Sequence, residues 1–292
     1  MLFICLLLTA YSFLVLLLAA YCLLFPLLLT AYCLLLTLIM TISIIIPCYN
    51  ESGRIAGSLQ KLGRFCEEQF KEYEIIVVDD GSKDGTWETV RGLRGLPIRS
   101  IRFAGNRGKG AAVKAGMLEA KGTYRFFTDA DLPYHLSAFS SAMGMFESAG
   151  CDLVLGSRYL PGSEDRAGTN VVRKLASRIF SSLAGRIFGI DIRDSQCGFK
   201  GFRDRAAEAL FSRCTTSGFA FDVEIFSLAK NLDLKICRTP VILVDNNQSS
   251  IRLPRDGLAM LWQLMKIRIA HKAKDDYSPQ RRRERRVNSF FV

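Results

Sequence analysis

Short apolar runs alternate with helix-type periodicity between residues 41 and 156, and this alternation restricts the fold more than any other feature. Thr41–Pro47 is a continuous, β-branched run, which is typical of a strand buried on both faces of a parallel sheet. The other predicted strands in this part are Tyr73–Val78, Ile98–Phe103, Tyr124–Thr128 and Asp152–Gly156. The predicted helices between them are Ile55–Phe70, Trp87–Leu93, a helix from Asn106–Gly110 to about Ala120, and Leu136–Ser148. The pattern predicts an α/β fold with a doubly wound, mostly parallel sheet flanked by helices.

Polar clusters follow four of these elements in turn. They are Asn50-Glu51, Asp79-Asp80, Asn106 to Lys109, and Asp129 with Asp131. A helix cap or a turn explains each cluster by itself. Ligands of open α/β sheets bind at the carboxyl ends of the strands, so four clusters at such positions predict one shared pocket.

Asp129 and Asp131 follow an aromatic strand and are separated by one small residue. Alternate residues of an extended chain project to the same side, so the two carboxylates can converge. Hard oxygen ligands of this kind suit Mg²⁺ or Mn²⁺, whereas a solvated turn is the alternative. Because the only histidines are His135 and His271, a divalent ion has to rest on carboxylates.

The nine cysteines are dispersed and form no C-x-x-C pair. This distribution predicts buried or free thiols in a reducing compartment and no disulfide framework.

Residues 1–40 differ in kind from the rest of the chain. Leu2–Met40 has no charged residue, so the net charge of +11 falls on the remainder. The block is long enough to cross a bilayer and lacks the basic region of a cleaved signal peptide. The block predicts a membrane segment, and Pro26 near its middle leaves it undecided whether the segment crosses the membrane once or twice. The basic residues that follow predict that the rest of the chain lies on the cytoplasmic side of the membrane. The sequence of Leu6–Tyr11 recurs as Leu27–Tyr32, as in low-complexity sequence. A second interpretation is therefore that translation starts at Met40 and that the apolar block is not part of the native protein.

The second half of the chain is less regular. Val171–Phe188 is amphipathic and basic; it either packs on the core with a solvated face or lies on a membrane surface. The other predicted elements are a loop and strand in Asp194–Arg203, a helix at Phe219–Lys230, one or two strands in Lys235–Val244 and a helix at Gly257–Ile269. The basic tail, residues 273–292, is expected to be disordered and has no folded nucleic-acid reader, so no nucleic-acid partner is predicted.

Several motifs together resemble a known family. The first four are Ser43-Ile-Ile-Ile-Pro-Cys-Tyr-Asn-Glu, Val77-Val-Asp-Asp-Gly-Ser-Lys-Asp-Gly-Thr, Asn106-Arg-Gly-Lys-Gly and Asp129-Ala-Asp. In this order they resemble an inverting family 2 glycosyltransferase of the GT-A fold. Gly156-Ser-Arg-Tyr, Asp194-Ser-Gln-Cys-Gly-Phe-Lys and Phe219-Ala-Phe-Asp-Val-Glu resemble its polyprenyl-phosphate branch, the dolichyl-phosphate glucosyltransferases and mannosyltransferases. The likeness runs from Thr41 to about Arg268, within a predicted GT-A domain of residues 41–272.

The resemblance implies a role for each matching residue. Asp129 and Asp131 would hold the metal, and Ala130 lies between them in the donor site. The other donor-site residues would be Pro47, Tyr49 and Glu51 at the nucleotide, Asp79 and Asp80 at the base and ribose, and Lys109. Arg158, Arg173 and Ser177 are the candidates for the acceptor phosphate. Some relatives add a Gln ligand where this chain has Pro133, which has no side-chain oxygen.

The predicted function is therefore metal-dependent, inverting transfer of a hexose from a nucleotide sugar to a polyprenyl phosphate at a membrane. UDP-glucose is favoured as the donor, and the lipid acceptor and the membrane are the expected partners. Asp129, Asp131, Arg158 and Asp194 are the catalytic candidates. The alternatives are GDP-mannose as donor, a glycan hydroxyl acceptor with Asp194 or Asp222 as its base, and a non-catalytic nucleotide-binding relative. The oligomeric state is left open.

Overall fold

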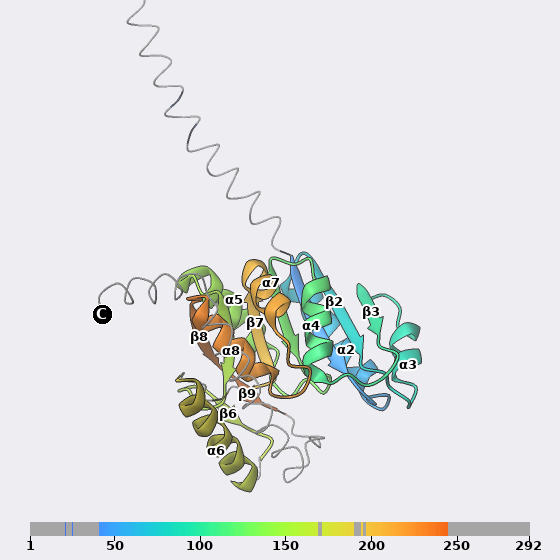
Figure 1. Cartoon of the computed structure of the whole chain (residues 1–292). Coiled ribbons are helices and arrows are strands. Elements are labelled where there is room, and N and C mark those ends of the chain that lie inside the picture. Colours follow the sequence, from blue (N-terminus) through green and yellow to red (C-terminus); the bar gives the residue numbers. More distant parts are fainter. Residues whose placement is uncertain are drawn as a thin grey trace, which may run out of the picture. The chain divides into compact units, whose positions relative to one another are not determined.

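A seven-stranded sheet forms the centre of the fold, in the order β3-β2-β1-β4-β7-β5-β8 (Figure 1). Its strands are β1 (Ile42–Cys48), β2 (Tyr73–Asp79), β3 (Ile98–Arg102), β4 (Tyr124–Thr128), β5 (Leu153–Ser157), β7 (Phe199–Arg203) and β8 (Ile236–Pro240). β3, β2, β1 and β4 run parallel, as do β5 and β8, and β7 is antiparallel to both of its neighbours. The predicted mostly parallel α/β sheet is confirmed.

The structure is a computed structural model that describes residues 41–168, 171–189, 194 and 197–244, together with Tyr21 and Phe25. In the helix at 171–188, side chains are described only for Ile179 and for 181–188. Residues 1–40 and 41–292 form two separate units. Among the described residues, no helix is both long and apolar enough to cross a membrane. The predicted membrane segment, the helix at Gly257–Ile269 and the tail at 273–292 lie outside the described residues, Tyr21 and Phe25 apart.

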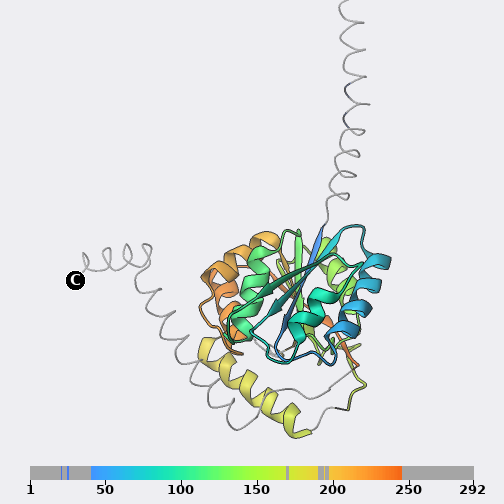
Figure 2. The ribbon, with the colours of Figure 1, turned by 90° about the vertical axis from the view of Figure 1, so that its right-hand side faces the viewer.

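Helices cover both faces of the sheet (Figure 2). α4 (Lys109–Glu119), α7 (Asp204–Arg213) and α8 (Phe221–Asn231) pack on one face, and α2 (Ile55–Gln69) and α5 (Ser137–Ala149) pack on the other. The short helix α3 (Thr86–Gly92) lies beside β2 and β3. The helical spacing of the sequence explains this packing, since α2 buries Ile55, Leu59, Leu62 and Cys66 on one side.

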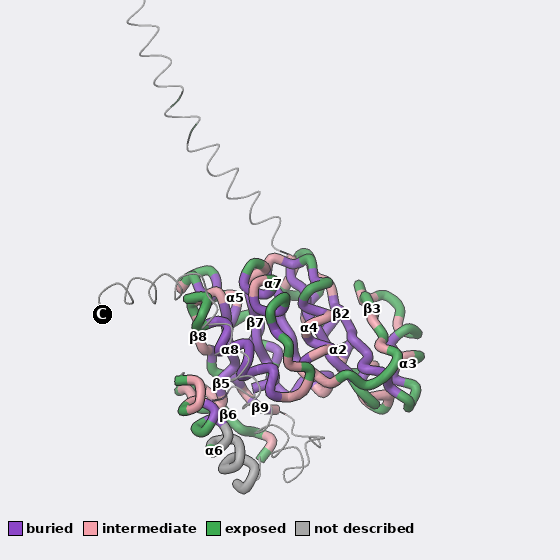
Figure 3. Tube along the Cα trace, in the orientation of Figure 1, coloured by how far each residue is buried: buried purple, intermediate pink, exposed green. Residues whose placement is uncertain are grey.

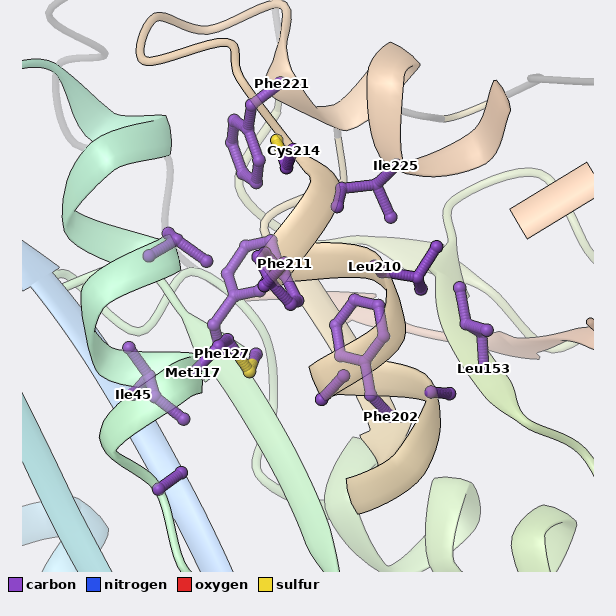
Figure 4. Close-up of a cluster of buried hydrophobic side chains, with 14 of the residues drawn as sticks. Ile45, Met117, Phe127, Leu153, Phe202, Leu210, Phe211, Cys214, Phe221 and Ile225 are labelled. Atoms are coloured by element: carbon purple, nitrogen blue, oxygen red, sulfur yellow. The ribbon is translucent and has the colours of Figure 1, made fainter. Parts of the chain in front are cut away.

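The core lies between the sheet and these helices (Figure 3). Every residue of β1 is buried, as expected for its uninterrupted apolar run, whereas the edge strand β3 is largely exposed. Figure 4 shows the larger cluster, in which Phe127 and Phe202 of the sheet meet Phe211 of α7 and Phe221 of α8. A second aromatic group on the opposite face includes Phe126, Phe139 and Phe199.

α6 (Val171–Phe188) has both buried and exposed positions near its carboxyl end. Ala184 is buried in a small cluster with Val223 and Phe226 of α8. Ile179 and Leu183 are exposed. The described part of this helix therefore packs on the core along one side and leaves two large apolar side chains uncovered. β9 (Ile242–Leu243) is the second of the one or two strands predicted in Lys235–Val244, whereas its partner β6 (Glu164–Asp165) in a two-stranded sheet was not predicted.

The prediction that the cysteines form no disulfide is wrong at one pair. Cys151 and Cys237 are disulfide-bonded, with their Cα atoms 6.0 Å apart. The two residues are 86 positions apart in sequence, and they meet because β5 and β8 are neighbouring strands. Sequence spacing contains no sign of that adjacency. The other cysteines in the described ranges, Cys48, Cys66, Cys197 and Cys214, are free and buried, as predicted.

Candidate active site

The polar residues predicted to form a site meet where the parallel strands end. β1, β2, β4 and β5 all end on this side of the sheet, which is called its carboxyl edge below. β7 begins there because it is antiparallel to β4, with Thr128 opposite Phe199. Asp129, which follows β4, therefore lies beside Gly198, which precedes β7. Arg158 follows β5 at the same edge.

Asp129 is held from two sides. Its Oδ1 lies 2.5 Å from Nζ of Lys109, the first residue of α4. Its Oδ2 lies against Gly198, where an added Cβ would be only 2.1 Å from that oxygen. The absence of a side chain at Gly198 therefore gives the Asp129 carboxylate its position. A third of the Asp129 side chain remains exposed, 32%, so it stays accessible to a ligand.

The surroundings of Asp131 suit a metal ligand. Its Oδ1 is buried and has no hydrogen-bond partner among the described residues. Burial and the neighbouring Asp129 carboxylate raise the pKa of Asp131 to about 6. A cation would relieve both the lost hydration and the repulsion between the two carboxylates, so this pair fits Mg²⁺ or Mn²⁺. The described residues contain no group of three or more His, Cys, Asp or Glu that could hold a metal, and such ions commonly complete their shell with water and substrate phosphates.

The loop after β1 is joined to the loop after β2. The Asn50 N–H donates to Ser82 Oγ at 2.9 Å, and the Glu51 N–H donates to Thr86 Oγ1 at 2.7 Å. Glu51 forms an ion pair with Arg54, while burial keeps the pKa of Glu51 raised. Next to this loop, Pro47 is the buried penultimate residue of β1 and Tyr49 is exposed, so the aromatic ring is available to a ligand.

Asp79 and Asp80 organise the turns around them. Asp79 accepts the Ser82 N–H at 2.9 Å and faces Arg102 Nε at 3.3 Å. Asp80 accepts the N–H groups of Arg107 and Gly108, at 2.7 and 2.9 Å. These two bonds hold the turn ahead of α4 in a non-helical form, with Gly108 at φ 99°. For this reason α4 starts at Lys109, near the end of the Asn106–Gly110 stretch that was predicted to open it.

Arg158 and Asp194 form a closed unit. The Asp194 carboxylate accepts the main-chain N–H of Arg158 and two N–H groups of its guanidinium, with Nε at 2.8 Å from Oδ1. Burial works against the guanidinium charge, but Tyr134 and Asp194 raise the pKa of Arg158 above its ordinary value. The Asp194 side chain is 1% exposed. Its oxygens are therefore engaged by Arg158 and are not open to a substrate proton.

The remaining acceptor candidates lie in α6. Arg173 and Ser177 are within the described backbone of the helix, but their side chains lie outside the described part of the structure.

The sequence interpretation missed one charged pair at this site. Lys200 of β7 and Asp222 of α8 are buried, with Nζ and Oδ1 2.8 Å apart. Lys200 lies between Phe199 and Phe202 in a strand-like run, and a lysine there is a signal that the sequence did contain. Gly198 was quoted within a motif, but its contact with Asp129 follows only from the antiparallel pairing of β7.

The chain matches Glycosyl transferase family 2 over residues 43–211. The dolichyl-phosphate beta-glucosyltransferase of Saccharomyces cerevisiae is 34% identical over 250 residues, which cover 79% of this chain and 75% of the relative. The protein of the same name from Dictyostelium discoideum is 32% identical over 243 residues, with 79% and 74% covered.

Solved structures share the fold at low sequence identity. Mannosyl-3-phosphoglycerate synthase from Rubrobacter xylanophilus has a TM-score of 0.60 at 17% identity, with 82% of this chain and 77% of that chain covered. Glucosyl-3-phosphoglycerate synthase from Mycobacterium tuberculosis, in complex with Mn²⁺, UDP-glucose and phosphoglyceric acid, has a TM-score of 0.57 at 19% identity, with 79% of each chain covered. The sheet is thus GT-A-like. The extent of the family match and the identity to these relatives confirm the predicted resemblance: the chain is a glycosyltransferase that belongs to glycosyl transferase family 2.

Proposed function

We propose that the protein transfers glucose from UDP-glucose to dolichyl phosphate with inversion, giving a β-linked dolichyl-phosphate glucose. The observation that carries this proposal is the identity to dolichyl-phosphate beta-glucosyltransferases along three quarters of the yeast relative, 75%. The pair Asp129 and Asp131 supports it, since one of its oxygens is buried without a partner.

Asp129 and Asp131 would hold Mg²⁺ or Mn²⁺ next to the diphosphate of the donor. When bound, the cation supplies Lewis-acid neutralisation of the charge that develops on the leaving nucleoside diphosphate. Lys109 adds a fixed positive charge beside Asp129. The buried bonds of Asp79 and Asp80 keep the surrounding turns in place, so little reorganisation is needed when the donor binds.

The ion pairs of Asp194 and Asp222 favour a phosphate acceptor over a hydroxyl acceptor. A sugar hydroxyl needs a base within hydrogen-bond reach, and both candidates, Asp194 and Asp222, are buried in ion pairs. A phosphate monoester is already anionic near neutral pH because its second pKa is about 6. It can attack the sugar carbon without giving up a proton, once positive groups have oriented it.

Arg158 is the acceptor-phosphate residue of this proposal, with Arg173 and Ser177 as its companions on α6. Asp194 fixes the guanidinium plane through Nε, which prepares Arg158 to meet a phosphate in one orientation. A lipid acceptor also agrees with the apolar N-terminal block, and we propose that the protein is membrane-associated with its catalytic domain in the cytoplasm.

The test is transfer of labelled glucose by the full-length protein in detergent with Mn²⁺. Product should form with UDP-glucose and dolichyl phosphate. No product should form when dolichol replaces dolichyl phosphate, or when a chelator removes the metal. Asp129→Asn/Asp131→Asn should abolish it, while Asp204→Asn, at the opposite edge of the sheet, should leave it unchanged. Equal transfer to dolichol would refute the phosphate acceptor, and preference for GDP-mannose would refute the donor. Donor binding without transfer to any acceptor would favour the non-catalytic alternative.

A further inference from the structure

A buried ion pair joins β7 to α8 at the site. Nζ of Lys200 and Oδ1 of Asp222 are 2.8 Å apart, and the two side chains are only 1% and 8% exposed. The ammonium also lies over the ring of Phe127, 5.0 Å from its centroid. Burying two charges costs desolvation energy, and a well-packed apolar pair in the same place is often as stable or more stable. Stability alone therefore does not explain this pair.

Lys200 connects to Asp129 through the turn before β7. Its ammonium donates to the Cys197 carbonyl at 2.6 Å. The next residue, Gly198, is the one against which Asp129 Oδ2 rests. The position of the Cys197 carbonyl sets the position of Gly198, so the lysine controls the surface on one side of the Asp129 carboxylate.

Asp222 connects to Asp129 from the other side, through Lys109. Gly110, next to Lys109, packs so closely on Phe221 that an added Cβ would lie 2.8 Å from the Phe221 Cβ. This contact brings the start of α4 to the start of α8, where Asp222 is the second residue. The ion pair with Lys200 anchors the start of α8, and the start of α4 packs against it, so Asp222 supports the position of Lys109. The Nζ of Lys109 in turn lies 2.5 Å from Asp129 Oδ1.

We propose that Lys200 and Asp222 are positioning residues for Asp129, and that they set the affinity of the site for a divalent cation and a nucleoside diphosphate. Lys200 fixes the turn at Gly198 on one side of that carboxylate, and Asp222 supports Lys109 on the other. The inference rests on the proposed function, because it assumes that Asp129 holds the cation.

The test compares two paired substitutions in the full-length protein. Lys200→Met/Asp222→Leu removes both charges together and leaves no unpaired charge in the core, but it deletes the bond to the Cys197 carbonyl. Lys200→Gln/Asp222→Asn also removes both charges and keeps an amide N–H that can donate to that carbonyl. Lys235→Met is the matched control, since it deletes a lysine bond to a carbonyl, that of Ala149, at 2.6 Å outside the site.

The measurements are Mn²⁺ binding in the presence of UDP, by calorimetry, and the thermal unfolding temperature without ligand. We expect the apolar pair to lower Mn²⁺ affinity by about 10-fold to 100-fold, the usual range when a residue behind a metal ligand is lost. The amide pair should recover most of it, and Lys235→Met should bind as the wild type does. Wild-type affinity in the apolar pair would overturn the inference. The inference would also be overturned if both paired variants lost Mn²⁺ affinity equally and their unfolding temperatures fell in parallel with that loss. A wild-type protein that does not bind Mn²⁺ with UDP would instead refute the proposed function.

Discussion

Gly198 shows at the residue scale how a missing side chain can define a site. An alanine Cβ there would lie 2.1 Å from Asp129 Oδ2. The backbone φ of Gly198 is not in the left-handed region, so the backbone can adopt the same conformation with alanine at this position. The flexible carboxylate is the part that must move. We expect Gly198→Ala to lower Mn²⁺ affinity in the presence of UDP by about 10-fold, with little change in the thermal unfolding temperature.

Gly144→Ala is the control for this substitution. Gly144 lies in α5, and an added Cβ there has no atom within 4 Å. It should bind Mn²⁺ as the wild type does. Unchanged metal affinity in Gly198→Ala would mean that the position of Asp129 does not depend on this contact.

Arg158 gives a second prediction at this scale, directed at the acceptor. Arg158→Lys keeps the charge but loses the planar donors that bind Asp194. We expect the KM for dolichyl phosphate to rise by about 10-fold or more, the consequence of about 1.4 kcal/mol of lost binding. UDP affinity measured by calorimetry should not change. A fall in UDP affinity with an unchanged acceptor KM would place Arg158 on the donor side.

Single residues also show what the sequence can and cannot predict. Asp129 and Lys109 were predicted to approach one site because each follows a recognisable element, and their ion pair shows that they meet. For Asp80 the sequence left both a turn and a donor-site role open, and its two main-chain bonds to Arg107 and Gly108 show that it shapes a turn. The pair of Lys200 and Asp222 depends on the packing of α8 on β7. No local pattern encodes such packing.

At the scale of elements, the strands were easier to predict than their neighbours in the sheet. Hydrophobic runs located β1 to β5 because burial acts on each run separately. β7 is inserted antiparallel between β4 and β5, and this position depends on a long connection in the chain. Because β7 is antiparallel, it starts at the site, and Gly198 comes to lie beside Asp129. The disulfide of Cys151 and Cys237 was missed for the same reason.

Glu74 of β2 links several elements away from the site. Its carboxylate accepts hydrogen bonds from Ser43 Oγ at 2.6 Å, the Lys121 N–H at 2.8 Å and the Arg99 guanidinium at 3.0 Å. Burial acts to raise the pKa of Glu74, but these bonds outweigh it and the pKa is lowered. A lowered pKa means stability that is present above the unfolded value of about 4.3 and is lost as the pH falls through the folded pKa.

We therefore expect Glu74→Gln to lower the free energy of unfolding by about 1–2 kcal/mol at pH 7. The difference from wild type should shrink as the pH falls below about 4. Urea unfolding followed by tryptophan fluorescence at pH 7 and pH 3.5 measures both. Glu147→Gln, at an exposed position of α5, is the control. A difference that is the same at both pH values would show that the charge of Glu74 does not contribute.

At the scale of the whole molecule, the described site is contained in one of the two units. The contacts of the site lie between Asn50 and Asp222, within the unit of residues 41–292. This unit has its own sheet and core, as an independently folding domain requires. The role that we propose for residues 1–39 is attachment to a membrane, which is separate from catalysis.

A chain that starts at Met40 should therefore keep its affinity for Mn²⁺ and UDP and its unfolding temperature. It should be released from membranes by alkaline carbonate, whereas the full-length protein should stay in the membrane pellet, because about 20 apolar residues suffice to cross a bilayer. A full-length chain in which an uncharged Gly/Ser run of equal length replaces residues 1–39 controls for length and should also be released. If the full-length protein is released as readily as the chain from Met40, the apolar block does not anchor it. If the intact mass of the native protein shows an N-terminus at Met40, the block is not part of the mature chain.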